Sequence, residues 1–336
     1  MIDVTVSITG IILCCDKNIQ SINLGNGYLI EKTHLDDFPF KDRIVDGRGD
    51  LNIAYLDSQL YDNNDTFFMC LKKTDVYQIE EPSFSAEQKV FSDKDFMPDA
   101  EVDTYKEREM GYLYNVFSLL RLFKAGNIGL KDVFLEHSFT ILGLIKNKMN
   151  QHSISESRNI VDERRYTLSA NEIIKCNRFL ADYQGKPFEL MKPSIDEFIW
   201  GLEQIDIPTG FEQFTTALEM TLLTANKPGK KQSLANRVAI LLGSKPTEIQ
   251  QLHSKMLNFY RFRSESLHEG NGSNITDIEL IEMEDVVRRV LCKLLDRCKS
   301  ELSVNSTKTW ENIKSDLITD LKSNVTAAQK AGILPT

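Results

Sequence analysis

Residues 2–8 read Ile-Asp-Val-Thr-Val-Ser-Ile, and this stretch decides the fold class. Apolar and polar residues alternate strictly, which is the period-two pattern of a strand with one buried face. Further strand-like runs follow at 66–71 and 76–79, separated by polar loops. We also expect two short strands around Gly25-Asn26-Gly27, the first of them over residues 19–24. The start of the chain therefore excludes an all-helical protein.

The apolar spacing lengthens after about residue 103. Apolar residues then recur every three or four positions, as on one face of an α-helix. Three pairs, Ser169…Glu172, Ser194…Glu197 and Thr276…Glu279, have the spacing of a capping box and predict where helices begin. The later helices are predicted over residues 209–224, 232–243, 246–269, 276–301 and 308–329.

The change of period predicts an α+β protein, a β-rich N-terminal domain followed by an all-α helical bundle. The 336 residues are 41% hydrophobic and 26% charged, as in ordinary globular proteins. We expect a β-rich domain over 1–102, with a sensing or regulatory role, and a helical connector over 103–165. A helical domain is expected over 166–305, with a C-terminal helix and tail over 306–336.

The formal net charge of −9 argues at first against nucleic acid as a partner. The charge is unevenly placed, however. Residues 31–103 hold 18 acidic and 8 basic side chains, a net of −10, which exceeds the total for the whole chain. Residues 225–268 hold 8 basic and 2 acidic side chains, a net of +6. A polyanionic ligand is therefore compatible with the helical half.

Export, membrane and metal signals are weak. The longest apolar runs, such as Ile11–Cys15, are far shorter than the roughly 18–20 residues that a spanning helix needs. The start Met1-Ile2-Asp3 has no basic stretch of the secretory type. The six cysteines include no C-x-x-C pair, and the histidines lie far from them. We therefore expect a cytoplasmic protein with reduced thiols, no cofactor and no metal.

One segment, Tyr260 to His268, carries candidate chemistry. Arg263 and His268 are separated by four residues, and Gly270-Asn271-Gly272 follows, so His268 falls in the last turn of a helix, where the macrodipole favours a cation. Five steps of about 100° leave the two positions roughly 140° apart in a regular helix. They converge only if the helix distorts or two copies face each other. Taken alone, the pair also fits a purely structural role.

The helical half resembles the HEPN superfamily, specifically the Apea-like HEPN domain of bacterial and phage proteins. The family hallmark, Arg-x(4–6)-His near a helix end, is matched by Arg263 and His268. Residues 214–223, with Glu219, and 234–243, with Arg237, are similar to two further family helices. The likeness covers roughly residues 110–300. One departure is Glu269, because the family commonly has glycine directly after its histidine.

The resemblance implies metal-independent RNA cleavage. The 2′-hydroxyl of the RNA would attack the neighbouring phosphate, leaving a 2′,3′-cyclic phosphate and a 5′-hydroxyl. His268 would then act as general base or acid, and Arg263 would hold the phosphate oxygens. Active sites of this family usually form between two subunits, so the resemblance also implies a homodimer with a composite site.

Six further residues are predicted to support this site. Ser264 adds a hydrogen bond, and Tyr260 belongs to the family-like string. Glu219 and Arg237 either orient the catalytic pair or form a buried structural ion pair with each other. RNA contacts are predicted for Lys255 and Arg261.

Three functions remain open from the sequence. The first is an endoribonuclease, a toxin or anti-phage effector whose front domain senses a phage trigger or binds a regulatory protein. The second is a non-catalytic HEPN module that binds RNA, a nucleotide or a protein partner. The third is a structural dimeric adaptor in which Arg263 and His268 only stabilise the end of the helix.

Overall fold

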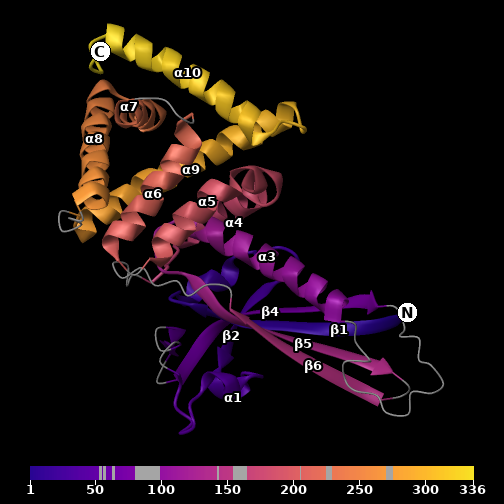
Figure 1. The fold of residues 1–336 in the computed structure, drawn as a ribbon. Helices are drawn as coiled ribbons and strands as arrows, with labels where there is room; N and C mark the ends of the chain where they lie inside the picture. Colours follow the sequence, from indigo (N-terminus) through magenta and orange to yellow (C-terminus); the bar gives the residue numbers. More distant parts are fainter. Residues whose placement is uncertain are drawn as a thin grey trace. The chain divides into compact units, whose positions relative to one another are not determined.

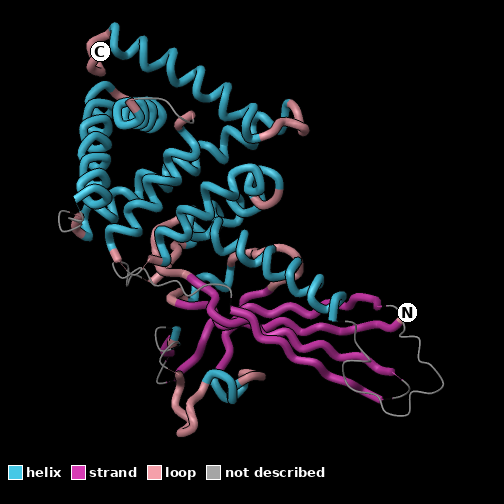
Figure 2. The backbone as a smooth tube through the Cα atoms, in the orientation of Figure 1, coloured by secondary structure: helices cyan, strands magenta, loops and turns pink. Residues whose placement is uncertain are grey.

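The computed structural model describes residues 1–52, 55, 58–62, 65–79, 99–141, 144–153, 165–204, 206–224, 229–269 and 275–336. Strands dominate the first half of the chain and helices the second (Figure 2). The chain therefore has the predicted α+β class, an antiparallel sheet followed by a helical region.

The chain divides into two compact units. The first comprises the described residues within Met1–Leu120, Gly126–Ser157 and Arg164–Ala181. The second comprises those within Arg121–Ala125 and Asp182–Thr336. A short segment that follows Leu120 in the sequence thus belongs to the helical unit.

The first unit is built on an antiparallel sheet of order β2-β4-β1-β5-β6, in which β3 also pairs with β4 (Figure 1). Strand β1 lies between β4 and β5, so its backbone groups are paired on both sides. The strands are β1 (Ile2–Leu13), β2 (Leu29–His34), β3 (Leu60–Asp62), β4 (Asp65–Ile79), β5 (Gly129–Ile141) and β6 (Leu144–Ser153).

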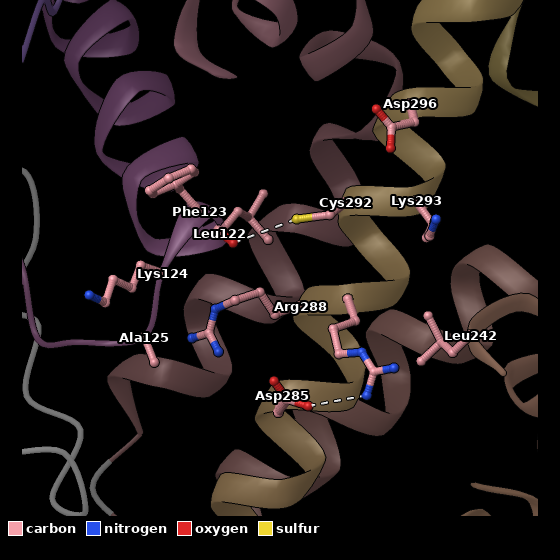
Figure 3. Close-up of a pocket in the computed structure, with 11 residues that line it drawn as sticks. Leu122, Phe123, Lys124, Ala125, Leu242, Asp285, Arg288, Cys292, Lys293 and Asp296 are labelled. Atoms are coloured by element: carbon pink, nitrogen blue, oxygen red, sulfur yellow. Dashed lines mark hydrogen bonds and ion pairs between the residues drawn. The ribbon is translucent and has the colours of Figure 1, made fainter. Parts of the chain in front are cut away.

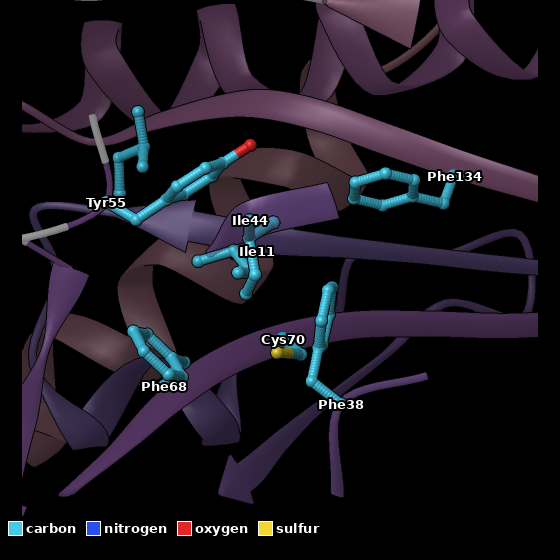
Figure 4. Packing of buried hydrophobic residues seen from close by; sticks show 8 residues of the cluster. Ile11, Phe38, Ile44, Tyr55, Phe68, Cys70 and Phe134 are labelled. Atoms are coloured by element: carbon cyan, nitrogen blue, oxygen red, sulfur yellow. The ribbon is translucent and has the colours of Figure 1, made fainter. Parts of the chain in front are cut away.

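Strand β1 confirms the alternation that predicts it. Val4, Val6 and Ile8 are fully buried, and the polar residues between them are not. The register with β5 shifts after Gly10, and from there both faces of β1 are buried. An apolar cluster packs around this end of β1 (Figure 4), and it includes residues of η2 (Leu35–Asp37), α1 (Lys41–Ile44) and their loops. The buried members are Ile11, Leu13, Phe38, Ile44, Tyr55, Phe68, Cys70 and Phe134.

Helix α3 (Asp99–Phe123) is tied to the sheet through a buried polar network. Glu109 of α3, only 1% exposed, accepts from the Lys73 ammonium at 2.9 Å, the Tyr28 hydroxyl at 2.8 Å and the Asn26 amide at 3.1 Å. Burial and the Glu109 charge raise the pKa of Tyr28. A charge this deep is tolerated because it is paired and hydrogen-bonded on several sides.

The expected helical connector over 103–165 is wrong beyond residue 123. Residues 129–141 and 144–153 form β5 and β6, which extend the same sheet. The alternation is lost in the first half of β5 because Leu130, Val133, Phe134 and Leu135 are all buried there. A strand that is buried on both faces has a nearly continuous apolar sequence. Hydrophobic periodicity alone does not distinguish such a sequence from a buried helix.

The strand expected over 19–24 is also wrong. Residues 17–21 form the 3₁₀ helix η1 (Lys17–Ser21), whose N-cap Asp16 accepts a hydrogen bond from the Asn18 amide at 3.0 Å. The Gly25–Gly27 turn is present, with Asn26 at a φ of 48°. It leads into β2, which pairs with the distant β4 rather than with the segment before the turn.

The second unit is helical. The five predicted helices from residue 209 onward are confirmed, with ends shifted by at most three residues. The helices are α5 (Lys186–Glu203), α6 (Ile207–Leu222), α7 (Lys230–Leu242), α8 (Pro246–Glu269), α9 (Asp277–Val304) and α10 (Trp310–Lys330), while α4 (Ala170–Tyr183) lies mainly in the first unit. No helix in the described ranges combines the length and apolar character needed to cross a bilayer.

Two of the three predicted capping boxes are confirmed. Ser169 with Glu172 and Thr276 with Glu279 form the reciprocal hydrogen bonds at the starts of α4 and α9. The box at Ser194 is wrong, because Ser194 is buried in the middle of α5. That helix already begins at Lys186, with a proline in its first turn, where the missing N–H costs nothing.

Replacing Glu109 by alanine should destabilise the protein by about 3–5 kcal/mol, because the buried Lys73 ammonium loses its closest carboxylate. Urea denaturation followed by circular dichroism measures this loss. Glu107→Ala is the matched control, since Glu107 lies two positions away in α3 and is exposed. Equal midpoints for the two variants would contradict a stabilising role for the network.

Candidate active site

The candidate site centres on an ion pair between α6 and α8. Helix α6 begins at the N-cap Asp206, whose carboxylate accepts from the Thr209 amide at 3.0 Å. Its apolar face is buried, and Glu219 lies in the last turn beside that face. Arg263 of α8 donates through Nη1 to Oε1 of Glu219 at 3.2 Å. The side chains are 20% and 18% exposed, so solvent screens this pair only partly.

Tyr260 completes the cluster one turn earlier on α8. The Arg263 guanidinium lies 5.8 Å from the centre of the Tyr260 ring, within cation–π range. Burial, the Glu219 charge and its hydrogen bond raise the pKa of Tyr260, and Arg263 opposes this effect. The structure therefore brings three of the predicted residues together. The Arg263 Nε is buried and has no hydrogen-bond partner in the described part of the chain.

Arg237 has a different role from the predicted one. Its guanidinium, 6% exposed, donates to the carbonyl oxygen of Leu222 at the C-terminal end of α6. The Lys314 ammonium of α10 donates to the Met220 carbonyl of the same turn. Burial lowers the pKa of Arg237 and Lys314, and the Arg237 charge adds to the effect on Lys314. Arg237 thus caps the helix that carries Glu219 and pairs with neither Glu219 nor Arg263 by any contact of the described side chains.

The two residues predicted to contact RNA, Lys255 and Arg261, form ion pairs within the protein. Lys255 lies 2.8 Å from Glu282 of α9, and Arg261 lies 3.6 Å from Glu265. Arg261 keeps 55% of its side chain exposed, and Ser264 is exposed as well. These residues border the Arg263 cluster along α8 without joining its hydrogen bonds.

The position of His268 is fixed only by the backbone. Helix α8 runs without interruption to Glu269, so position 268 lies in its last turn, as predicted. The side chains of residues 266–269 and all of residues 270–274 lie outside the described residues. Among the described residues, no group of three or more His, Cys, Asp or Glu side chains could hold a metal ion.

His253 is buried in α8 at 5% exposure. The Gln232 amide nitrogen of α7 lies 2.8 Å from its Nε2 and 3.2 Å from the Asn236 side-chain oxygen. With the amide donating, the imidazole accepts at Nε2 and is therefore neutral. The spacing of three residues to the buried Met256 is the signal that places His253 on the apolar face.

Comparisons with family models, with curated proteins and with solved structures find no match for this chain. We therefore infer function from the residues of the site and their chemistry.

Stability should fall on acidification partly through His253. Burial lowers the pKa of this imidazole. When the pH falls below the ordinary pKa near 6.5, His253 is therefore protonated in the unfolded chain but still neutral in the folded chain, and this difference favours unfolding. His253→Gln should therefore lose less stability than the wild type between pH 7.5 and 5, as measured by urea denaturation. At pH 8 the His253 imidazole is neutral in both the folded and the unfolded chain. A difference in stability between the variant and the wild type at that pH therefore reflects packing alone. Identical pH slopes for the two proteins would contradict this burial effect.

Proposed function

We propose that the helical unit is a HEPN-type endoribonuclease that cuts RNA without a metal ion and acts as a toxin or anti-phage effector. The observation that carries the proposal is the Glu219–Arg263 ion pair, five positions before His268 in the last turn of α8. The order of the motifs on α6, α7 and α8 supports it. A cytoplasmic location is part of the proposal, and the six free cysteines are compatible with a reducing compartment.

In this mechanism His268 removes the proton from the 2′-hydroxyl, and the 2′-oxygen attacks the adjacent phosphorus. The bond from phosphorus to the 5′-oxygen breaks, and the leaving oxygen receives a proton from the protonated His268 of a second copy. The products are a 2′,3′-cyclic phosphate and a 5′-hydroxyl. Proton transfer of this kind contributes about 10²–10⁴-fold to the rate.

Arg263 stabilises the charge that develops on the phosphate. Its guanidinium has five N–H donors, and the contact to Glu219 uses one nitrogen. Glu219 holds the Arg263 guanidinium in one orientation, so we describe Glu219 as a positioning residue. A preorganised guanidinium stabilises a transition-state anion at little reorganisation cost.

The geometry of α8 favours a composite site. Its backbone is a continuous helix through both positions, so positions 263 and 268 are about 140° apart around the helix axis. One phosphate therefore meets Arg263 and His268 more easily when they come from two copies. We propose a homodimer with RNA as its partner, and a sensing or regulatory role for the first unit.

One contact favours a second candidate function, a non-catalytic HEPN module. The Glu219 carboxylate offsets the Arg263 charge and competes with a phosphate for the same donors. In that case Arg263 serves mainly to hold α6 and α8 together, and the module binds RNA, a nucleotide or a protein without cleaving it.

The full-length protein should cleave labelled single-stranded RNA in the presence of a chelator, and His268→Ala should reduce the rate by about 10²–10⁴-fold. Gel analysis and enzymatic end-labelling identify the cyclic phosphate and the 5′-hydroxyl. The matched control is His253→Gln, which removes a histidine from the same helix but outside the site. RNA with a 2′-deoxy residue at the cleaved position should resist.

Glu219→Gln separates the two candidate functions. It keeps the shape of the side chain and removes the charge that orients Arg263. For a ribonuclease we expect kcat to fall on the order of tenfold with KM nearly unchanged. Unchanged cleavage in His268→Ala would refute the catalytic proposal, while RNA binding without cleavage in the wild type would favour the non-catalytic module.

A further inference from the structure

The exposed face of α8 carries uncharged polar side chains. Five exposed residues of this helix fall within about 100° of one another around the helix axis. They are Thr247, Gln250, Gln251, Ser254 and Asn258, and together we call them the polar face of α8. The opposite side of the helix, which includes Met256 and Phe259, is buried in the helical unit. Figure 1 shows α8 at the outer side of that unit.

The side chains of the polar face form no hydrogen bond or ion pair with the described part of the chain. Helix α9 differs, because charged pairs cover much of its surface. Beside a cavity of about 450 Å³ that basic residues of α9 line with the end of α3, Asp285 lies 3.6 Å from Arg289 (Figure 3). Such pairs are usual on a helix surface that contacts only water. The free amides and hydroxyls of α8 each offer a donor and an acceptor to a ligand.

Accessible cations lie beside the polar face. The Gln232 amide lies 2.8 Å from the His253 ring, so the first turn of α7 is held against the middle of α8. Lys230 and Lys231 belong to that first turn, are exposed, and form no ion pair with any described side chain. Arg261 follows the polar face by one turn and is 55% exposed, although it lies 3.6 Å from a carboxylate. A polyanion that lies along α8 therefore meets positive charge.

Position 268 lies on the same side of α8 as the polar face. It follows Gln250 by five full turns, about 27 Å along the axis, and it is about 20° from Arg261 around the axis. Arg263 is about 160° from Arg261, on the side of the helix that contacts α6. The polar face therefore continues along α8 to the position of the proposed general base.

The composition of this surface favours RNA over a protein partner. The core of a protein interface is rich in aromatic and other apolar side chains, whereas no large hydrophobic residue is exposed in the described part of α8. Amides and hydroxyls instead match the edges of nucleic-acid bases. In single-stranded RNA these edges are open, while in an A-form duplex the major groove is too narrow for side chains to reach them.

We propose that the polar face of α8 binds a single-stranded RNA and recognises its bases, an inference that rests on the proposed function for its substrate. Gln251, Ser254 and Asn258 hydrogen-bond to base edges. Lys230 and Lys231 hold neighbouring phosphates, so they contribute affinity without sequence information. The strand runs along α8 toward position 268. These residues determine which RNA is bound, and they take no part in the bond-breaking step.

Fluorescence anisotropy with a labelled single-stranded RNA of mixed sequence tests the proposal. The full-length His268→Ala protein is used with a chelator, so that the RNA stays intact. Adding Gln251→Ala, Ser254→Ala and Asn258→Ala together should weaken binding on the order of tenfold, because the contacts to base edges are lost. An abasic version of the same strand should bind equally to the parent and to this triple variant.

The two lysines should respond differently. Lys230→Ala combined with Lys231→Ala should weaken the binding of every single strand, with or without bases. The slope of log K against log salt should become shallower by about 1.4, since each phosphate contact to a single strand contributes about 0.7.

Matched controls are available on α10, where Lys322, Ser323 and Asn324 are exposed. Replacing the last two by alanine, or Lys322 alone, should leave RNA binding unchanged. The proposal is overturned if the triple variant of α8 binds the single strand as tightly as its parent, or if a duplex of the same sequence binds the parent equally well. It is also overturned if sedimentation shows that the triple variant dissociates a dimer, because the polar face is then an interface between copies.

The outcomes also separate this inference from the proposed function. Binding that depends on the polar face, without cleavage by the wild type, would support the inference and refute the catalytic proposal. Cleavage by a triple variant that retains His268, at the rate and the sites of the wild type, would support the catalytic proposal and overturn the inference.

Discussion

The C-terminal turn of α6 is the constraint on which the helical unit depends. A helix ends with carbonyl groups that have no partner in the helix and with the negative end of its macrodipole. Three cations from three other helices meet this turn. Arg237 of α7 and Lys314 of α10 bind carbonyl oxygens, and Arg263 of α8 binds the Glu219 carboxylate. These contacts at one helix end thus connect four helices.

This arrangement changes how the local charge is understood. Residues 225–268 carry a net of +6, but much of that charge is already engaged. Arg237 caps α6, and Lys255, Arg261 and Arg263 each lie in an ion pair. On α9, Lys293 has no ionic partner in the described chain, and Arg289 has only long contacts.

The helices were predictable because their signals are local. Helical spacing and the capping box at Thr276 follow from residues three or four positions apart, and α8 was predicted over its observed span. Strand β5 was not predictable, because burial on both faces removes the alternation that identifies a strand. At Ser194 the local signal gave a false helix start. The spacing to Glu197 matches a capping box, but α5 begins earlier, at Lys186.

For the candidate site, the sequence by itself determined that Arg263 and His268 lie near the end of one helix, and that Glu219 and Arg237 lie on helices of their own. Only the tertiary structure decided that Glu219 pairs with Arg263 while Arg237 caps α6. It also decided that the basic residues of α9 line a cavity with the end of α3. The reason is physical: helix periodicity acts over a few residues, whereas these contacts join positions far apart in the chain, which only packing brings together.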